Sequence, residues 1–577
     1  MQTKINLILL VCLILISLNI GAQNDDHAAM IKECEELIVK KMESDHLVGV
    51  SAAIIVNDSV IWKKGFGYAD IENNIPMTEN TVVNIASATK TFTALAVMQL
   101  YEKGLLDIDQ PLNKYLPEFH PKTRGEDLEQ LTVRSVITHS SGIQTDILKN
   151  SDLGSGKYTD VLGYINETYL IYPPGLVESY SNSGYNILGS LIKKASRQDY
   201  PEYIHKNILA PLGMDHSGFL ADSLQNRTSV YSGGEKLKEY GFRDIASGGI
   251  YTDINDFIKY AKGLLDAWNG RNSPLIQTAT IREMFTRQHT VLIESNKKGL
   301  GWFMFRNDSV FAVTHAGDGA FGHAEICLIP DRNAAVMILI NSAEGESLKR
   351  DFSFKFISKF GLSVPDIIPA PVIGEVSQKK EPIQLSDDIL TEHAGKYSQG
   401  FSYLTIIVKE GNLEVARDNK HYLLKALSEN EFVPCEIVGE DSLVQKDNER
   451  YCFLDSAGFH MLFQEVDNKE YRLGYRLNEF DPALLSKKPG IYEHFGYQLL
   501  VGDTKFKGAE LSLSADSVLM LNLIAFDGEF GFPLNVISDE YAVTSGLGTG
   551  FAFTVKLTED DNYDIIDFAG LTFRKNK

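Results

Sequence analysis

Cysteine is scarce in this sequence, with five among 577 residues. Only Cys435 and Cys452 stand close together within one β-rich region, so they are the plausible disulfide partners, although the sequence does not establish the bond. Basic residues are also in the minority, since 55 Lys and Arg face 77 Asp and Glu. Such an acidic chain is expected to stay soluble and to avoid nucleic acid and anionic lipid.

Long apolar runs are missing after the N-terminus. The run from Ile5 to Leu18, followed by small residues up to Ala22, predicts a secretory signal peptide at residues 1–22. With about 14 apolar residues, this run is too short for a membrane span. We therefore expect a periplasmic or secreted protein without a membrane span once the signal is removed.

Several motifs that would indicate different chemistries do not occur. There is no Gly-x-Ser-x-Gly elbow, which argues against an α/β-hydrolase, and no Walker loop. The thirteen histidines form neither His-x-His nor His-Glu-x-x-His, so a zinc hydrolase is not expected. Gly546–Gly550 lacks a βαβ setting and is interpreted as a loop between two strands. No metal or cofactor is predicted.

The motif Ser-x-x-Lys occurs four times, at Ser87/Lys90, Ser190/Lys193, Ser295/Lys298 and Ser377/Lys380. Context favours the first, because Ser87 follows a strand-like run at residues 81–85 and begins a helical stretch at residues 89–101. Free N–H groups and the positive dipole end of a helix N-terminus favour developing negative charge. Lys90 follows one turn later on nearly the same face. The pair therefore suits a nucleophile with its base.

Two further motifs complete a candidate site for acyl transfer: Tyr180-Ser181-Asn182 and His315-Ala316-Gly317. A serine hydroxyl attacks a carbonyl only if a positioned base removes its proton and donors stabilise the oxyanion. A competing Tyr164/Asn166 pair precedes the turn at residues 173–175, whereas Tyr180 follows that turn and leads into a helix.

The surroundings of these motifs resemble the serine β-lactamase-like family, which includes class C β-lactamases, D-alanyl-D-alanine carboxypeptidases, D-aminopeptidases and related esterases. The resemblance covers about residues 24–362, in the family's order. It rests on Gly65-Phe-Gly-Tyr-Ala-Asp70, Asn84-Ile-Ala-Ser-Ala-Thr-Lys-Thr-Phe-Thr-Ala94, Leu131-Thr-Val-Arg-Ser-Val-Ile-Thr-His-Ser-Ser-Gly142, Tyr180-Ser-Asn-Ser-Gly-Tyr-Asn-Ile-Leu-Gly189, Ala246-Ser-Gly-Gly-Ile-Tyr-Thr252 and Gly299-Leu-Gly-Trp302.

The resemblance implies a role for each site residue. Ser87 would be the nucleophile, and Lys90 and Tyr180 would share the proton transfer; which of the two takes the serine proton stays open. Asn182 would hydrogen-bond Lys90 and the amide of the substrate. The backbone N–H of Asp318 would pair with that of Ser87 as the oxyanion hole.

The third motif bears on the substrate. Typical β-lactamases have Lys-Thr-Gly at this place, whereas His315 is mostly neutral at pH 7 and gains its proton near pH 6.5 if unperturbed. Recognition of a carboxylate is therefore expected to be weaker or conditional on pH. Gly317 would let the substrate lie against the strand edge.

The expected fold class is α+β. Strands near residues 48–62 and 303–340 form an antiparallel sheet with helices at 25–42 and 348–360 on one face and a helical subdomain on the other, over residues 23–362. A linker at 363–385, with four prolines between 365 and 382, leads to a β-rich domain at 386–478, and a linker at 479–489 to a second at 490–577. Both are expected to be small β-barrel or lipocalin-like domains that pack on the catalytic domain. A role in shaping the cleft or in binding a ligand is the alternative.

We therefore expect a secreted, cofactor-free serine hydrolase acting on a small amide or ester, or on a D-amino-acid peptide. Transfer of the acyl group to an alcohol acceptor is a second hypothesis. A β-lactamase or a penicillin-binding sensor with slow turnover is a third. The sequence names neither the natural substrate nor the oligomeric state.

Overall fold

The computed structural model describes residues 27–577 apart from short internal stretches, the residues 152–155, 221–223, 240, 242, 289–297, 308, 320–321, 363–380, 418–419, 439–441, 457, 467–468, 480–488, 496–499, 502–503, 526–527 and 545–551. The expected signal peptide, the loop Gly546–Gly550 and most of both expected linkers lie outside the described residues.

A seven-stranded antiparallel sheet forms the centre of the N-terminal part, in the order β3-β2-β1-β12-β11-β10-β9. Its strands are β1 Gly49–Val56, β2 Ser59–Asp70, β3 Ile75–Pro76, β9 Phe303–Arg306, β10 Phe311–Gly319, β11 Gly322–Ile329 and β12 Ala334–Ile340, with the turn η4 Pro330–Arg332 before β12. Strand β1 pairs with β12, which brings together the first and the last strand of the sheet in chain order.

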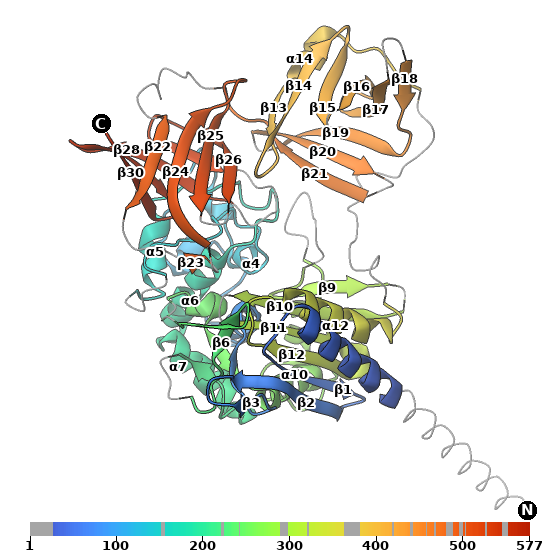
Figure 1. The fold of residues 1–577 in the computed structure, drawn as a ribbon, viewed down its shortest axis with the longest axis vertical. Coiled ribbons are helices and arrows are strands. Elements are labelled where there is room, and N and C mark those ends of the chain that lie inside the picture. Colours follow the sequence, from blue (N-terminus) through green and yellow to red (C-terminus); the bar gives the residue numbers. More distant parts are fainter. Residues whose placement is uncertain are drawn as a thin grey trace, which may run out of the picture.

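The two faces of this sheet pack against different helices, because side chains alternate along each strand. In β12, Val336 and Ile338 pack with the helix at residues 27–44 and with α12 (Glu346–Ser358). Met337 and Leu339 pack with the helical region on the opposite face. The predicted arrangement of the α+β domain is thus confirmed (Figure 1).

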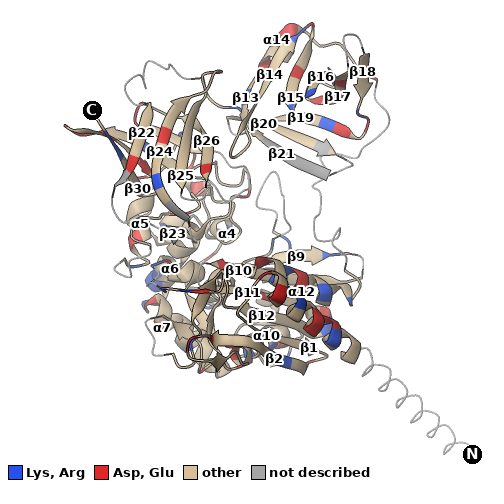
Figure 2. Cartoon of the chain, viewed as in Figure 1, with Lys and Arg blue, Asp and Glu red and all other residues tan. Residues whose placement is uncertain are grey.

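Charged residues of both signs lie along the outer helices (Figure 2). Lys355 of α12 and Lys359, which directly follows α12, each pair with Glu33 of the 27–44 helix, at 2.7 and 2.9 Å. These exposed ion pairs link the two terminal helices that cover the sheet.

The helical region lies between β3 and β9. Its helices are α2 Thr89–Glu102, α3 Leu112–Tyr115, α4 Val133–Ile137, α5 Asp160–Ile165, α6 Asn182–Ser196, α7 Tyr200–Ile204, α8 Ala210–Leu212, α9 Ile245–Gly248, α10 Ile254–Trp268 and α11 Thr278–Met284, with short turns η1 Ala86–Ala88, η2 Leu128–Gln130 and η3 His205–Leu209. Short strands accompany them: β4 Val83–Asn84, β5 Gly218–Phe219, β6 Val230–Ser232, β7 Glu235–Leu237 and β8 Ile250–Thr252.

The first C-terminal domain is a β-barrel preceded by α14 (Asp387–His393). A bridge between Tyr397 and Arg476 closes it beside its first and last strands. The strands are β13 Gly395–Ser398, β14 Tyr403–Lys409, β15 Asn412–Arg417, β16 Lys420–Ala426, β17 Glu431–Val438, β18 Ser442–Gln445, β19 Glu449–Ser456, β20 Phe459–Val466 and β21 Lys469–Tyr475.

The second C-terminal domain is also a barrel, closed by the pairing of β22 with both β24 and β30. Its strands are β22 Gly490–Phe495, β23 Leu500–Val501, β24 Thr504–Leu513, β25 Leu519–Ala525, β26 Glu529–Val536, β27 Tyr541–Thr544, β28 Thr554–Glu559, β29 Tyr563–Phe568 and β30 Leu571–Asn576. The two predicted β-barrel domains are therefore confirmed.

Both barrels pack on one segment of the helical region. Ile171, Tyr172, Leu176 and Val177 form an apolar cluster with Met461, Phe463 and Tyr475 of the first barrel and with Val543 and Ala552 of the second. Figure 1 shows the second barrel above α4 and α6. The barrels thus lie against the segment that leads to Tyr180.

The disulfide that the sequence suggested does not form between Cys435 and Cys452. Cys452 on β19 lies opposite Glu431, four residues from Cys435 along β17. Four residues of a strand span about 13 Å, well beyond the roughly 7 Å between Cα atoms that a disulfide allows. Burial instead raises the pKa of the Cys435 thiol.

The structure also bears on the expected absence of a membrane span. In the part of the chain that the structure describes, no helix is long and apolar enough to cross a membrane.

Candidate active site

Ser87 lies in a tight turn between strand β4 and helix α2. The residue before it, Ala86, has a φ of 42°, a conformation that residues other than glycine rarely adopt. Asn84 fixes this turn, because its Oδ1 accepts from the N–H of Ala86 at 3.0 Å and its Nδ2 donates to the carbonyls of Gly248 and Ile250. The strand and helix that the sequence predicted thus hold Ser87 at the start of α2.

Lys90 is completely buried one turn after Ser87. Its Nζ lies 3.0 Å from Ser87 Oγ, 2.6 Å from Asn182 Oδ1 and 2.8 Å from the carbonyl oxygen of Ser247. Burial lowers the pKa of Lys90 from 10.5 to about 7, although the carboxylates of Asp146 and Asp244 oppose the shift. A substantial fraction of Lys90 is therefore an uncharged amine at neutral pH.

Asp146 determines how Asn182 is oriented. Asn182 Nδ2 donates to Asp146 Oδ1 at 2.9 Å, and this carboxylate oxygen only accepts hydrogen bonds when it is ionised. The carbonyl oxygen of Asn182 therefore points to Lys90. Burial raises the pKa of Asp146 to about 6, while its hydrogen bond with Asn182 opposes the shift.

Tyr180 is half-buried, and its ring lies between Lys90 and His139. Lys90 Nζ lies 4.9 Å from the centre of its ring, and the His139 ring stacks on it at 4.2 Å. Burial raises the pKa of the Tyr180 phenol above its usual range, and its hydrogen bond with Ser87 opposes the shift. His139 Nδ1 accepts from the N–H of Ser181 at 3.0 Å, and burial lowers the pKa of His139 well below 6.5, so this ring is neutral.

The third motif lies on the part of β10 that extends beyond β9. Strand β9 pairs with β10 only over residues 311–314, whereas β11 pairs with it through Gly319. Residues 315–319 thus present one strand edge to the turn at Ser87. A Cβ on Gly317 would lie 2.0 Å from the carbonyl oxygen of Ile85. This close approach between backbones requires a glycine at this position, while its predicted contact with substrate stays a prediction.

Asp318 lies on this strand edge, and its carboxylate is held by two buried side chains. His323 Nδ1 and Lys349 Nζ lie 2.7 and 2.9 Å from Asp318 Oδ1. These contacts anchor the strand segment whose N–H is expected in the oxyanion hole.

His315 is buried with its ring edge against Phe303. Burial, together with the nearby charges of Lys90 and Lys298, lowers the pKa of His315 to about 3, although the carbonyl of Ala316 opposes the shift. The value near 6.5 applies to an unperturbed histidine, and burial places the pKa of His315 well below it. His315 is neutral throughout the physiological range.

Sequence reasoning missed a buried ion pair beside the site. Lys298 Nζ lies 2.6 Å from Glu178 Oε1, with 7% of each side chain exposed, and 5.8 Å from the centre of the Tyr180 ring. Nothing in the sequence connects residues 178 and 298.

The competing Ser-x-x-Lys motifs do not form a comparable arrangement where the structure describes them. Ser190 Oγ donates to the carbonyl of Asn186 within its own helix. Ser295 and the pair Ser377/Lys380 lie outside the described residues, whereas Lys298 takes part in the ion pair with Glu178. Among the described residues, the motif at Ser87 is thus the one that meets Asn182.

One cluster of polar residues lies apart from this site. His216, Asp253 and Asp256 place ligand atoms within 4.8 Å of one another, but Asp253 caps α10 by accepting from the N–H of Asp256, and Lys259 pairs with Asp256. The hydrogen bonds of a helix start explain this cluster.

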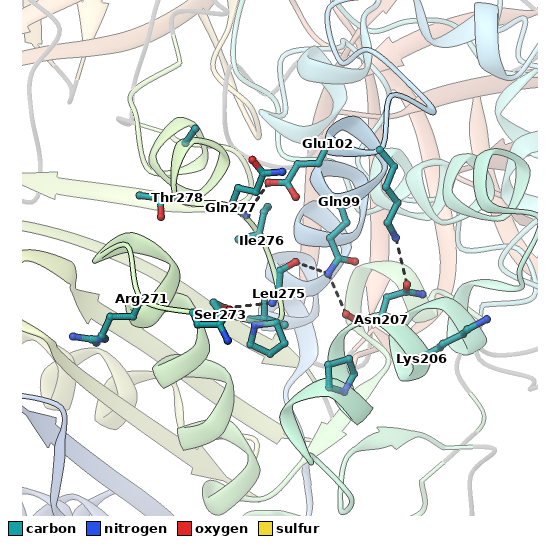
Figure 3. A pocket seen from close by; sticks show the side chains of 15 residues that line it. Gln99, Glu102, Lys206, Asn207, Arg271, Ser273, Leu275, Ile276, Gln277 and Thr278 are labelled. Carbon is teal, nitrogen blue, oxygen red and sulfur yellow. Dashed lines mark hydrogen bonds between the residues drawn. The ribbon is translucent and has the colours of Figure 1, made fainter.

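A hollow of about 750 Å³ lies at the opposite end of α2, where Gln99 donates to the carbonyls of Asn207 and Leu275 (Figure 3). Nine residues of helix, or about 14 Å, separate Gln99 from Lys90.

Comparison with known proteins identifies the family to which the chain belongs. The Beta-lactamase family model matches residues 34–356, more than half of its length. The chain belongs to the β-lactamase family. Protein flp of Staphylococcus aureus (strain NCTC 8325 / PS 47) is 27% identical over 323 residues, which are 54% of this chain and 63% of flp. The chain thus spans less than two thirds of this curated relative.

Solved structures share the fold of this β-lactamase-family protein. The octameric penicillin-binding protein homologue from Pyrococcus abyssi has a TM-score of 0.51 and 25% identity, covering 77% of this chain and 99% of that one. A class C β-lactamase has a TM-score of 0.51 and 20% identity, covering 59% and 98%. Family membership and fold together support a protein of the serine hydrolase type.

Proposed function

We propose that this protein hydrolyses an amide or ester through an acyl-enzyme on Ser87, with Lys90 as the base. The environment of Lys90 carries the proposal. An uncharged amine has two N–H donors and one lone pair, and two of its three neighbours, Asn182 Oδ1 and the carbonyl of Ser247, can only accept. The lone pair is left for the third neighbour, the hydroxyl of Ser87.

The reaction then follows from the contacts of each group. Lys90 takes the proton of Ser87 as Oγ forms a bond to the acyl carbon, and the N–H groups of Ser87 and Asp318 stabilise the oxyanion. Tyr180 keeps its proton at neutral pH, so it serves as a donor: it passes a proton to the leaving group as that bond breaks and regains one from Lys90. Water then reacts with the acyl-enzyme by the same steps in reverse order.

The state of His315 bears on the substrate class. A neutral ring supplies no fixed charge for a carboxylate, which favours small esters, amides and D-amino-acid amides over β-lactams. Transfer of the acyl group to an alcohol would need only a bound hydroxyl that reacts faster than water.

Labelling with a fluorophosphonate tests the nucleophile. Wild-type protein and the control Ser190→Ala, which removes the hydroxyl of a competing Ser-x-x-Lys motif, should be labelled, whereas Ser87→Ala should be folded and unlabelled. Label retained in Ser87→Ala would refute the assignment. Screening of D-amino-acid amides, short esters and nitrocefin then defines the substrate, and added alcohols reveal transfer if new esters form. An acyl-enzyme that persists for hours would indicate a sensor.

A further inference from the structure

One short segment lies between the catalytic helix α6 and the second barrel. On the side of α6, Ser181 Oγ donates to the carbonyl of Gln144 at 2.7 Å and the N–H of Ser183 donates to the carbonyl of Thr145 at 3.0 Å. Asp146 follows directly and accepts from Asn182 at 2.9 Å. Residues 144–146 therefore run along the start of α6, where the second motif lies.

The same three-residue segment is bonded to the barrel on its other side. The N–H of Thr145 donates to the carbonyl of Ala552 at 2.9 Å, and the N–H of Ala552 donates back to Thr145 Oγ1 at 3.3 Å. The N–H of Thr554, at the start of β28, donates to Gln144 Oε1 at 3.1 Å. All four residues are at least 95% buried. These bonds are shielded from water, which strengthens their hold on geometry.

We propose that the second barrel is a positioning element of the active site, which holds Asp146 against Asn182 through Thr145 and thereby orients Lys90. This inference rests on the proposed role of Lys90 as the base. The contacts run without a gap from the barrel to Lys90. The barrel is bonded to Thr145, and Asp146 is the next residue in the chain. Asp146 accepts from Asn182 at 2.9 Å, and Asn182 Oδ1 lies 2.6 Å from Lys90 Nζ.

The charges around Asp146 show what its position controls. Lys90 and Asp244 face it from α2 and from the residue before α9, and Arg243 beside Asp244 donates to the carbonyls of Ile147 and Lys149. An ionised Asp146 favours the ammonium form of Lys90. Movement of the segment would therefore change both the orientation of Asn182 and the pH at which Lys90 becomes an amine.

A simpler explanation is that the barrel only packs on the hydrolase domain. The apolar cluster around Tyr172 already supplies such packing. A second polar contact at the same interface offers a matched control: Lys122 Nζ donates to Tyr541 OH at 2.5 Å, and no bond leads from this pair to Asn182 in the described part of the chain. Loss of that contact should affect stability without altering the site.

The test uses the full-length chain and the pH dependence of kcat/KM for an uncharged ester. Thr145→Val removes the hydroxyl that bonds the barrel but keeps the size of the side chain, and Thr145→Ser restores the hydroxyl. We expect Thr145→Val to lose about tenfold in kcat and to displace the pH profile, and Thr145→Ser to behave as wild type. Asp146→Asn should move the midpoint of the acidic limb down by about one pH unit, because Lys90 loses its anion. Tyr541→Phe should leave the profile unchanged.

The outcomes separate the two proposals. Suppose that kcat/KM of the wild type falls on the acidic side with a midpoint near pH 7, and that neither Thr145→Val nor Asp146→Asn moves this midpoint. That result would refute the positioning role of the barrel but not the role of Lys90 as the base. An equal displacement by Tyr541→Phe would also refute it, because any loosening of the interface would then suffice. A wild-type profile without that limb would refute Lys90 as the base and the inference with it. Circular dichroism and fluorophosphonate stoichiometry verify that each variant is folded.

Discussion

The pH dependence of acylation is the most direct consequence of the buried Lys90. With a pKa of about 7, roughly half of the lysine is an amine at pH 7 and about 1% at pH 5. Only the amine can take the proton of Ser87, so kcat/KM should rise about 100-fold from pH 5 to a plateau above pH 8. The direction follows from burial, which disfavours the ammonium form in the folded protein.

The pKa values of two neighbouring groups decide which residues this pH profile reports. His315, with a pKa of about 3, does not titrate in the window, whereas Asp146, at about 6, is coupled to Lys90. The limb between pH 6 and 7 therefore belongs to the pair of Lys90 and Asp146. The assay is hydrolysis of an uncharged chromogenic ester from pH 5 to 9, with Ser87→Ala as the blank. A flat profile, or one whose midpoint lies near 10, would show that Lys90 is not the base.

Three further changes test other parts of the site. Lys90→Ala and Tyr180→Phe should each slow acylation by about two to four orders of magnitude, and the double variant should be little worse, since the two groups act as a unit; additive losses in single-turnover kinetics would contradict this. Gly317→Ala should destabilise the fold by about 1 to 3 kcal/mol and abolish labelling, because the new Cβ meets a backbone oxygen; normal labelling would oppose this. Lys298→Met should lower the free energy of unfolding by about 3 to 5 kcal/mol in urea, and adding Glu178→Gln should recover part of it; no recovery would show that the pair is not coupled.

The local structure around Ser87, the proposed nucleophile, could be predicted from the sequence because it depends on neighbouring residues in the chain. Ser87 and Lys90 are one helical turn apart, and the preceding strand and the following helix are continuous in the chain. The same holds for Asn182, which starts α6 shortly after Tyr180. The sheet was equally readable, since alternating apolar residues in β1, β11 and β12 record its two covered faces.

The partners of these residues could not be predicted because they depend on tertiary contacts. Asp146 lies 36 positions before Asn182, and no spacing rule links a carboxylate at that distance to an amide. The protonation state of His315 depends on burial and on charges from distant segments, so the value for a solvated ring was misleading.

Proline makes one of the barrel strands hard to predict from the local sequence. Strand β26 contains Pro533, a residue that usually marks an edge or a break. In the barrel, Pro533 pairs with Met520 on one side, while the pairing with β27 begins only at Leu534. Prediction from local composition cannot foresee such a staggered register.

The charge of Lys298 near the third motif bears on which substrates the site can bind. The sequence indicated that a histidine in place of a lysine leaves no fixed cation for a carboxylate. A cation is nevertheless present near the site. Lys298 lies beside the Tyr180 ring, and its charge helps to lower the pKa of His315. Glu178 lies 2.6 Å from that lysine, however, and a carboxylate of the substrate would have to compete with it. Separating Lys298 from Glu178 would leave two buried charges without partners, which is costly in free energy. The proposed preference for small esters and amides over β-lactams thus rests on the pairing of Lys298 with Glu178 as well as on the neutral ring of His315.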